Sequence, residues 1–142
     1  MSGSRPTGPA FIELLEADES ALDAFLELGV SEGAVLDYKK DLPSDISETI
    51  AAMANTDGGT VILGVEEDAT TKKPARRPGV QMKDPQGAVV GQVRSMLEPV
   101  PDLSTHVVKR SDGTAYVVVV TAPSTRRIVI HRAKSLLVRV GD

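Results

Sequence analysis

Six residues in the first half of the chain have types and a spacing that could support chemistry on a phosphate. They are the acids Glu32, Asp37, Glu66, Glu67 and Asp68, with Lys39 two residues after Asp37. Carboxylates that converge on one point bind Mg²⁺ or Mn²⁺, and such an ion orients water and stabilises charge on phosphorus during hydrolysis. A neighbouring lysine would stabilise the same charge. The alternative is that the acids only solvate strand ends and cap helices, and that Asp37 and Lys39 form a simple ion pair.

A second set of candidate residues is basic and lies in the second half of the chain. Residues 1–70 contain 3 Lys/Arg against 15 Asp/Glu, a net charge of −12, whereas residues 71–142 contain 13 against 5, a net charge of +8. Clustered Lys and Arg neutralise the phosphates of a nucleic-acid backbone and release its counterions. The residues expected to contact phosphate are Lys72, Lys73, Arg76, Arg77, Arg126, Arg127, Arg132, Lys134 and Arg139. The alternative is that the two halves neutralise each other across the fold.

Several other kinds of chemistry are not expected from this sequence. It contains no Cys, which excludes disulfides, thiolate zinc sites and a cysteine nucleophile. The phosphate-loop pattern G-x-x-x-x-G-K-[ST] is missing, so no nucleotide cofactor is expected. His106 and His131 stand alone and are interpreted as structural. No apolar run suits a signal peptide or a membrane span, so we expect a cytoplasmic protein without a membrane partner.

Aromatic residues make up only 3% of the chain, and Tyr38 and Tyr116 are the ones expected to be most accessible. Proteins that bind single strands without sequence preference stack bases on aromatic side chains. The scarcity of such side chains favours recognition of nucleic acid through its backbone and shape.

The elements that would position these residues follow from the spacing of apolar residues. The length of 142 residues and the ordinary composition predict one domain with its own core. Residues 1–9 are expected to be flexible, and residues 10–29 predict one long or two short amphipathic helices. Residues 35–39 predict a strand, with Asp37 and Lys39 on the same face.

The middle of the chain gives the clearest pattern. Residues 46–54 predict a helix with a capping box between Asp45 and Glu48. Residues 60–65 are almost continuously apolar and predict a strand buried on both faces at the centre of a sheet. If this strand neighbours residues 35–39, Asp37 and the acids at 66–68 meet at one edge of that sheet. The turn between helix and strand, Asn55-Thr56-Asp57-Gly58-Gly59, is interpreted as architectural, because its glycines permit a left-handed helix end.

The second half mixes a loop, a helix and strands. Residues 67–84 lack periodicity and predict a long basic loop, and a helix around 89–97 is expected to end before Pro99. Strands are predicted around 104–110, 115–121, 127–131 and 136–140, with a hairpin turn at Asp112-Gly113. This order predicts the α+β class, a single domain with a mixed β-sheet flanked by helices.

Four sequence segments, in order, resemble one known family. They are Glu32 with Leu36-Asp37-Tyr38-Lys39, the stretch 50–59 (I-A-A-M-A-N-T-D-G-G), the strand 61–65, and Leu137-Val138-Arg139-Val140-Gly141. Residues 30–142 are similar to the Schlafen-type AlbA-like domain, an α+β module associated with DNA binding that also occurs in animal Schlafens. Two departures are Asp37, where Glu is usual, and a long Lys/Arg/Pro loop where many members have a short hairpin.

The resemblance implies nucleic-acid binding, to DNA or to structured RNA. In Schlafens with nuclease activity it further implies metal-dependent cleavage of structured RNA, such as tRNA, by three acids. By motif position two of these are Glu32 and Asp37, and the third is Glu66 or Asp68, with Lys39 assisting. All four acids are then candidate Mg²⁺ or Mn²⁺ ligands. Animal Schlafens enclose RNA between two such lobes, so a single lobe implies a homo-oligomer.

Three functions therefore remain open at this point. A nucleic-acid-binding module needs only the basic residues of the second half. A Mg²⁺- or Mn²⁺-dependent endoribonuclease also needs the acids to meet within reach of one metal ion. A protein-assembly domain without nucleic acid would be favoured if Val117–Val120 formed an exposed edge strand, because unpaired strands attract partners.

Overall fold

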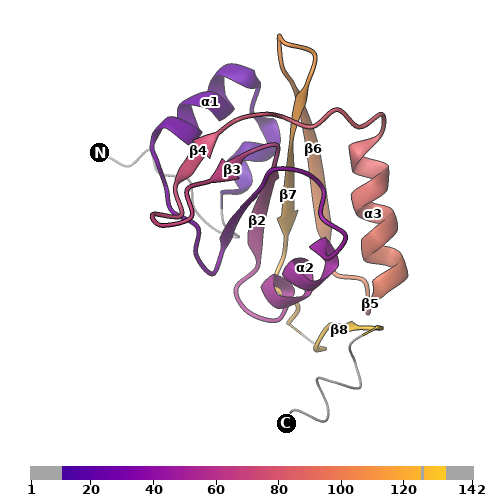
Figure 1. Cartoon of the computed structure of the whole chain (residues 1–142). Coiled ribbons are helices and arrows are strands. Elements are labelled where there is room, and N and C mark those ends of the chain that lie inside the picture. Colours follow the sequence, from indigo (N-terminus) through magenta and orange to yellow (C-terminus); the bar gives the residue numbers. More distant parts are fainter. Residues whose placement is uncertain (1–10, 126, 134–142) are drawn as a thin grey trace.

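The computed structural model describes residues 11–125 and 127–133. Its centre is a four-stranded sheet in the order β1-β2-β7-β6 (Figure 1). β1 (Leu36–Lys39) and β2 (Gly59–Leu63) run parallel, whereas β7 (Ala115–Thr121) is antiparallel both to β2 and to β6 (Leu103–Lys109). The predicted α+β domain with a mixed sheet is confirmed.

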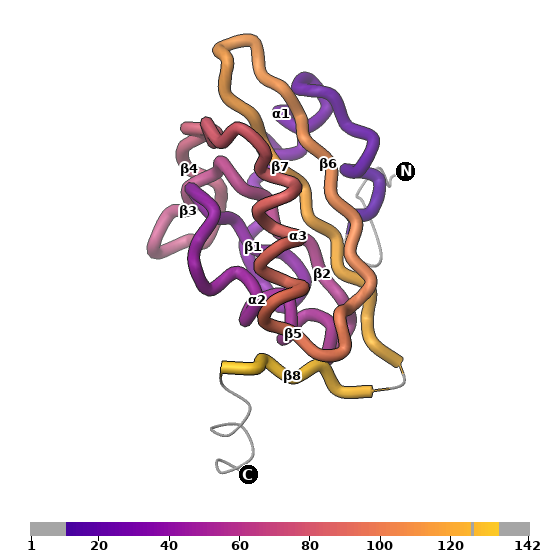
Figure 2. The backbone as a smooth tube through the Cα atoms, turned by 90° about the vertical axis from the view of Figure 1, so that its right-hand side faces the viewer, coloured from indigo at the N-terminus to yellow at the C-terminus, as the bar shows by residue number. Residues whose placement is uncertain are grey.

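The apolar run of β2 is buried on both faces because helices cover both sides of the sheet. Val61 and Leu63 contribute to the core beneath α2 and α3, whereas Ile62 belongs to the core on the α1 side. Figure 2 shows α3 in front of the sheet and α1 behind it. The predicted central, doubly buried strand is confirmed.

The N-terminal helical segment is part of the domain core. It consists of a 3-10 helix, η1 (Ile12–Glu16), and of α1 (Glu19–Glu27). Asp18 separates them and caps α1, because its Oδ1 accepts a hydrogen bond of 2.8 Å from the Ala21 N–H. Leu22, Phe25 and Leu26 follow at helical spacing and are buried against the sheet. The alternative of two short helices is the one that the structure contains.

Two helices cover the opposite face. α2 (Ile46–Ala54) connects β1 to β2, and α3 (Pro85–Met96) precedes β6. Asp84 caps α3 through a 3.1 Å hydrogen bond from the Gly87 N–H, with Pro85 in the first turn. Asp45 makes no side-chain cap bond at α2, so the predicted capping box is not formed.

The predicted basic loop at 67–84 is wrong over its first half. β3 (Glu66–Glu67) and β4 (Pro74–Arg76) form a small antiparallel hairpin, and only then does the chain cross to α3 (Figure 1). The turn is stabilised by Asp68, whose Oδ1 accepts hydrogen bonds of 2.8 Å from the N–H groups of Thr70 and Thr71. Strands of two and three residues leave no period-2 pattern in the sequence, which is why this hairpin was not predicted.

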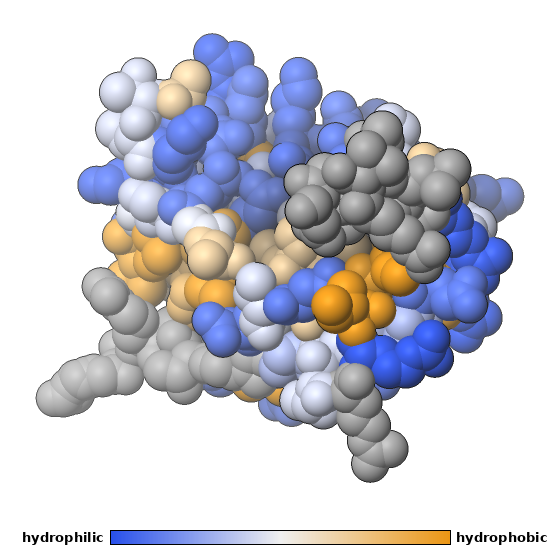
Figure 3. All heavy atoms as spheres, turned by 90° about the horizontal axis from the view of Figure 1, so that it is seen from below, coloured by the Kyte–Doolittle hydropathy of each residue, from blue (hydrophilic) through white to orange (hydrophobic). Residues whose placement is uncertain are grey.

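The C-terminal strands also differ from expectation. β8 (Ile130–His131) is shorter than the predicted strand at 127–131 and pairs with β5 (Leu97–Glu98). The predicted strand at 136–140 and the N-terminus at 1–9 lie outside the described residues. Ile128, just before β8, is 73% exposed, and apolar surface is visible among polar atoms when the molecule is viewed from below (Figure 3).

β7 lies between β2 and β6, so Val117–Val120 is not an edge strand, and the condition that would have favoured a protein-assembly domain is not met. None of the described helices has the length and apolar character needed to cross a membrane.

Candidate functional site

The pairing of β1 with β2 brings acidic residues together at one edge of the sheet. The register places Asp37 opposite Val61, so the chain leaves β2 beside the end of β1. Glu32, which precedes β1, is fixed by two hydrogen bonds: its N–H donates to the Lys72 carbonyl at 2.8 Å, and its Oε2 accepts from the Tyr38 N–H at 2.7 Å. Three segments of the chain therefore meet at Glu32.

The third acid at this point is Glu67, rather than the predicted Glu66 or Asp68. Asp37 and Glu67 are the two carboxyl groups close enough to Glu32 to raise its pKa. Glu66 instead lies 4.0 Å from the Arg76 guanidinium, and Asp68 is engaged in the hairpin turn. The pairing register of the hairpin shifts between Glu66 and Glu67, which pair with Arg76 and Pro74.

The position of Glu32 changes the pKa of its carboxyl group. Burial of Glu32, followed by the proximity of Asp37 and Glu67, raises the pKa of Glu32 to about 8. Lys39 Nζ lies 3.3 Å from Asp37 Oδ2, so the predicted pairing on one face of the strand is confirmed. Burial alone lowers the pKa of Lys39, but Asp37 and Glu32 outweigh it and raise the pKa above its usual value.

The acids do not assemble into a metal site. Across residues 11–125 and 127–133, no three His, Asp or Glu side chains are placed to hold one ion. Asp37, one of the predicted ligands, is already paired with Lys39 at 3.3 Å. This arrangement does not fit a bound Mg²⁺ or Mn²⁺, so no hydrolytic step is assigned to it. The catalytic roles of Glu32, Asp37, Lys39 and Asp68 stay predictions.

The predicted phosphate-binding residues fall into three groups. Several are ion-paired, and the pairs are Lys72 with Glu67 at 4.0 Å, Arg76 with Glu66 at 4.0 Å, and Arg132 with Glu98 at 3.5 Å. Within the described part of the chain, no carboxylate lies within 4.0 Å of the charged groups of Lys73 and Arg127. Arg126, Lys134 and Arg139 lie outside that part.

Arg77 is the most firmly neutralised of these residues. Its guanidinium lies 3.6 Å from Asp23 and 3.7 Å from Glu27, both on α1. The interpretation that the acidic and basic halves neutralise each other therefore holds for Arg77 and in part for the β3–β4 hairpin. It does not hold for Lys73.

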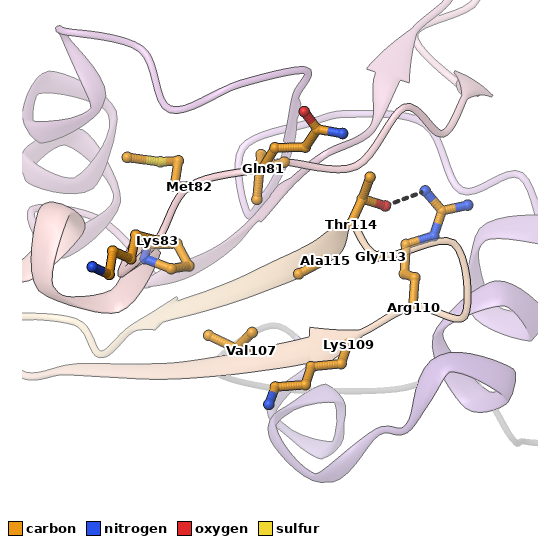
Figure 4. A pocket seen from close by; sticks show the side chains of 11 residues that line it. Gln81, Met82, Lys83, Val107, Lys109, Arg110, Gly113, Thr114 and Ala115 are labelled. Carbon is orange, nitrogen blue, oxygen red and sulfur yellow. Dashed lines mark hydrogen bonds between the residues drawn. The ribbon is translucent and has the colours of Figure 1, made fainter.

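Three further basic residues surround a pocket beside the start of α3 (Figure 4). Lys83 precedes α3, Lys109 ends β6, and Arg110 begins the turn that leads to β7. Lys83 belongs to the basic segment 67–84 of the sequence analysis. No sequence pattern indicated that it would line the same pocket as Lys109. The antiparallel pairing of β6 with β7 and the crossing of residues 77–84 bring them together.

The residues 55–59 have an architectural role, as predicted. Asn55 Nδ2 donates to the Val129 carbonyl at 2.9 Å, and Asn55 Oδ1 accepts from the Val129 N–H at 2.7 Å. Gly58 has a φ of +80°, and a Cβ there would lie 2.6 Å from the Thr121 carbonyl oxygen. This motif therefore joins the end of α2 to the segment before β8.

The histidines and tyrosines are structural. His106 hydrogen-bonds to the Ala17 carbonyl at 2.7 Å, and His131 to Ser47 Oγ at 3.0 Å. Tyr38 and Tyr116 are 1% and 0% exposed, so the expectation that they are accessible is wrong. Both side chains belong to the core on the α1 side.

Comparison with known proteins decides the family. The sequence profile described as Schlafen, AlbA_2 matches residues 32–142. The chain belongs to the Schlafen AlbA_2 family. A search of curated proteins found no match to this chain.

Two solved structures resemble this member of the Schlafen AlbA_2 family. One is the N-terminal domain of a protein from Nitrosomonas europaea that is named for its relation to the ATP-dependent DNA helicase RecG. It has 26% sequence identity and a TM-score of 0.56, with 77% of this chain and 74% of that chain covered. The other is the DIP2311 protein from Corynebacterium diphtheriae, with 17% identity and a TM-score of 0.51 over 85% of this chain and 27% of that one. The latter likeness concerns the fold alone.

Proposed function

We propose that this chain binds nucleic acid through phosphate contacts made by exposed basic residues of its second half. Membership of the Schlafen AlbA_2 family and the helicase-related name of the Nitrosomonas europaea protein support this proposal. The observation that carries it is the β3–β4 hairpin. Its turn presents two exposed lysines, Lys72 and Lys73, and Lys73 has no carboxylate within 4.0 Å among the described residues.

The hairpin suits contact with a backbone rather than with bases. Arg76 is 81% exposed in its side chain, and its pairing with Glu66 spans 4.0 Å. Such solvent-exposed pairs contribute little to stability, so a phosphate can replace the carboxylate at small cost. The two tyrosines are buried, which leaves no accessible tyrosine for base stacking among the described residues. The expected partners are therefore DNA or structured RNA, bound with little sequence preference.

The test is fluorescence anisotropy with labelled duplex DNA, single-stranded DNA and tRNA over a range of salt concentrations. Affinity should fall linearly on a log–log plot against salt, with a slope of about −0.9 per phosphate contact on duplex DNA. The double variant Lys72→Gln/Lys73→Gln should weaken binding to every duplex sequence alike and reduce that slope by about 2 units. Lys40→Gln, which removes one exposed lysine from the first half, is the control.

Unchanged binding in the double variant would reject the hairpin as the contact. The same nucleic acids should remain intact with the wild-type protein in Mn²⁺ and in EDTA. Cleavage that depends on Mn²⁺ and is lost in Asp37→Asn would instead favour the endonuclease function. Light scattering tests the expected homo-oligomer, in which symmetric pairing of two chains would double the number of phosphate contacts.

A further inference from the structure

The layer between α3 and the sheet is open at the end where α3 begins. Beyond the end of β2, Val80 pairs with the first residue of β7. Val80 and Ala115 exchange backbone hydrogen bonds of 2.8 and 3.0 Å. Val107 on β6 also packs against the core beneath α2 and α3. These residues line a cavity of about 390 Å³ that is not covered by the helix (Figure 4). The cavity therefore has an apolar floor.

The rim of this cavity is basic. Lys109 is the cross-strand partner of Ala115, so both side chains stand on the same face of the sheet. Lys83, on the segment before α3, also lines the cavity, and Figure 4 shows its side chain and that of Lys109 extending outward at separate points of the rim. No carboxylate of the described residues lies within 4.0 Å of either ammonium group, and the residues that line the cavity include no acid. The two lysines are thus available to a bound anion.

Arg110 forms a fixed, positively charged wall. Its Nη1 donates to the Arg77 carbonyl at 2.7 Å and to Thr114 Oγ1 at 3.2 Å, and its guanidinium carbon lies 4.6 Å from the centroid of the Tyr116 ring. The exposed Asp112 lies 3.5 Å from Nη1 and partly offsets this charge. Because these contacts hold Arg110 in place, its charge is positioned before any ligand arrives.

The surroundings restrict the direction from which an anion can approach. Lys109 also borders a hollow beside α1 whose acids are Asp18, Glu19, Asp23 and Glu27. These carboxylates repel a phosphate chain on that side. On the other side the chain runs from β4 through residues 77–83, which contain no acid and lead from the β3–β4 hairpin to Lys83.

We propose that this pocket holds one unstacked nucleotide of a nucleic-acid strand, with its sugar and base on the apolar floor and the phosphates of the strand at the basic rim that carries Lys83 and Lys109. This inference rests on the proposed function. The cavity volume lies within the range of pockets that bind small organic molecules. Bases in a duplex are stacked and paired, so the pocket selects single strands or unpaired nucleotides.

The charge test compares Lys83→Gln and Lys109→Gln with the wild type by anisotropy, using labelled oligo(dT) and a duplex of equal length. Each variant should weaken oligo(dT) binding about fivefold at 0.1 M salt and reduce the single-strand salt slope by about 0.7. Duplex binding should change by less than about twofold. Arg94→Gln is the matched control, because Arg94 lies in the last turn of α3, about 14 Å along the helix from Pro85. Its single-strand slope should equal that of the wild type.

The shape test uses Ala115→Leu, which fills the floor without changing charge and should weaken oligo(dT) binding but not duplex binding. Thermal midpoints show whether the variants are folded. If Ala115→Leu does not fold, the two lysine variants alone test the pocket. Free dTMP at millimolar concentration separates a mononucleotide ligand from a strand. Binding of dTMP that the lysine variants abolish, without any binding of oligo(dT), would overturn the proposal of a strand.

The two proposals fail in different ways. If neither lysine variant changes oligo(dT) binding while Lys72→Gln/Lys73→Gln weakens nucleic-acid binding, the pocket is rejected and the proposed function stands. If the wild type binds none of the nucleic acids, the proposed function itself is rejected, and this inference with it.

Discussion

Glu32 connects three segments of the chain through one side chain and one backbone N–H. Its contacts with Tyr38 and Lys72 are neutral hydrogen bonds to backbone groups, whereas its contacts with Asp37 and Glu67 bring carboxyl groups together. A proton on Glu32 removes its negative charge and allows it to donate a hydrogen bond to one of these two carboxylates. Stability should therefore depend on the protonation of this residue.

The pH dependence follows from the raised pKa of Glu32, which is about 8 in the folded protein against 4.5 in the reference state. The stabilisation that its proton provides is fully present below pH 4.5 and is lost as the pH rises through 8. We expect the free energy of unfolding, measured by urea denaturation, to decline between pH 5.5 and about 8.5. Glu32→Gln should flatten this decline, because an amide accepts from the Tyr38 N–H and donates to a carboxylate at every pH. An unaltered decline in the variant would contradict the assignment.

A second residue-scale prediction concerns Asn55. Asn55→Ala removes both hydrogen bonds to Val129 and should lower the free energy of unfolding by about 1 to 2 kcal/mol. Asn55→Asp keeps the acceptor for the Val129 N–H but loses the donor, so its effect should be smaller. Hydrogen exchange at the Val129 amide provides the local readout. Equal protection in wild type and Asn55→Ala would show that these bonds do not hold the segment.

At the scale of elements, the β3–β4 hairpin is attached to the rest of the fold at a few points. Arg77, directly after β4, contacts two carboxylates of α1, and its carbonyl accepts from Arg110. Within the hairpin, only two pairs of residues are matched between the strands β3 and β4. Its position therefore depends on these tertiary contacts rather than on its own sequence.

Arg77→Gln tests this attachment. The change leaves Asp23 and Glu27 without their cation, and we expect a loss of about 1 kcal/mol in the free energy of unfolding by urea denaturation. Nucleic-acid affinity should change by less than about twofold, because the charge of Arg77 is already balanced by two carboxylates. A loss of affinity as large as that of Lys72→Gln/Lys73→Gln would place Arg77 among the phosphate contacts.

Elements with a strong apolar pattern could be predicted from the sequence, whereas those held by distant partners could not. The helices α2 and α3 each bury one face, and their apolar residues recur at helical spacing. The strands β2 and β7 are buried on both faces, and their residues are almost continuously apolar. In the acidic cluster, Glu32 and Asp37 could be found by motif position. Glu67 could not be distinguished from its acidic neighbours, because the short hairpin that positions it, with its shifted register, leaves no pattern in the sequence. Lys83 and Lys109 come from separate segments and meet only in the folded chain.

At the scale of the whole molecule, the core on the α1 side extends beyond the region matched by the family. The match begins at residue 32, but Leu22, Phe25 and Leu26 of α1 pack against Tyr116 and Val118 of the sheet. Each of these three helical side chains is at most 4% exposed. The helical segment before residue 30 therefore covers one face of the sheet and is not an appendage.

Removing residues 1–29 should expose this face. Loss of even one large buried side chain costs about 2 to 5 kcal/mol, comparable with the whole stability of a small domain. The truncated chain should be unfolded or aggregated at 25 °C, as judged by circular dichroism and light scattering. Removing residues 1–9 alone is the control and should leave the thermal midpoint close to that of the full chain. A folded, monomeric chain that starts at residue 30 would contradict this role of α1.

The central place of β7 also has a consequence for how the protein is made. β2 is synthesised long before β7. One edge of β2 pairs with β1, but its other edge has no partner until residues 115–121 have left the ribosome. At usual rates of translation this delay lasts on the order of several seconds. During that time the nascent chain carries an apolar strand with an open edge, which is a site for aggregation. We therefore expect the central sheet to become resistant to aggregation only when its last strand, β7, has been synthesised.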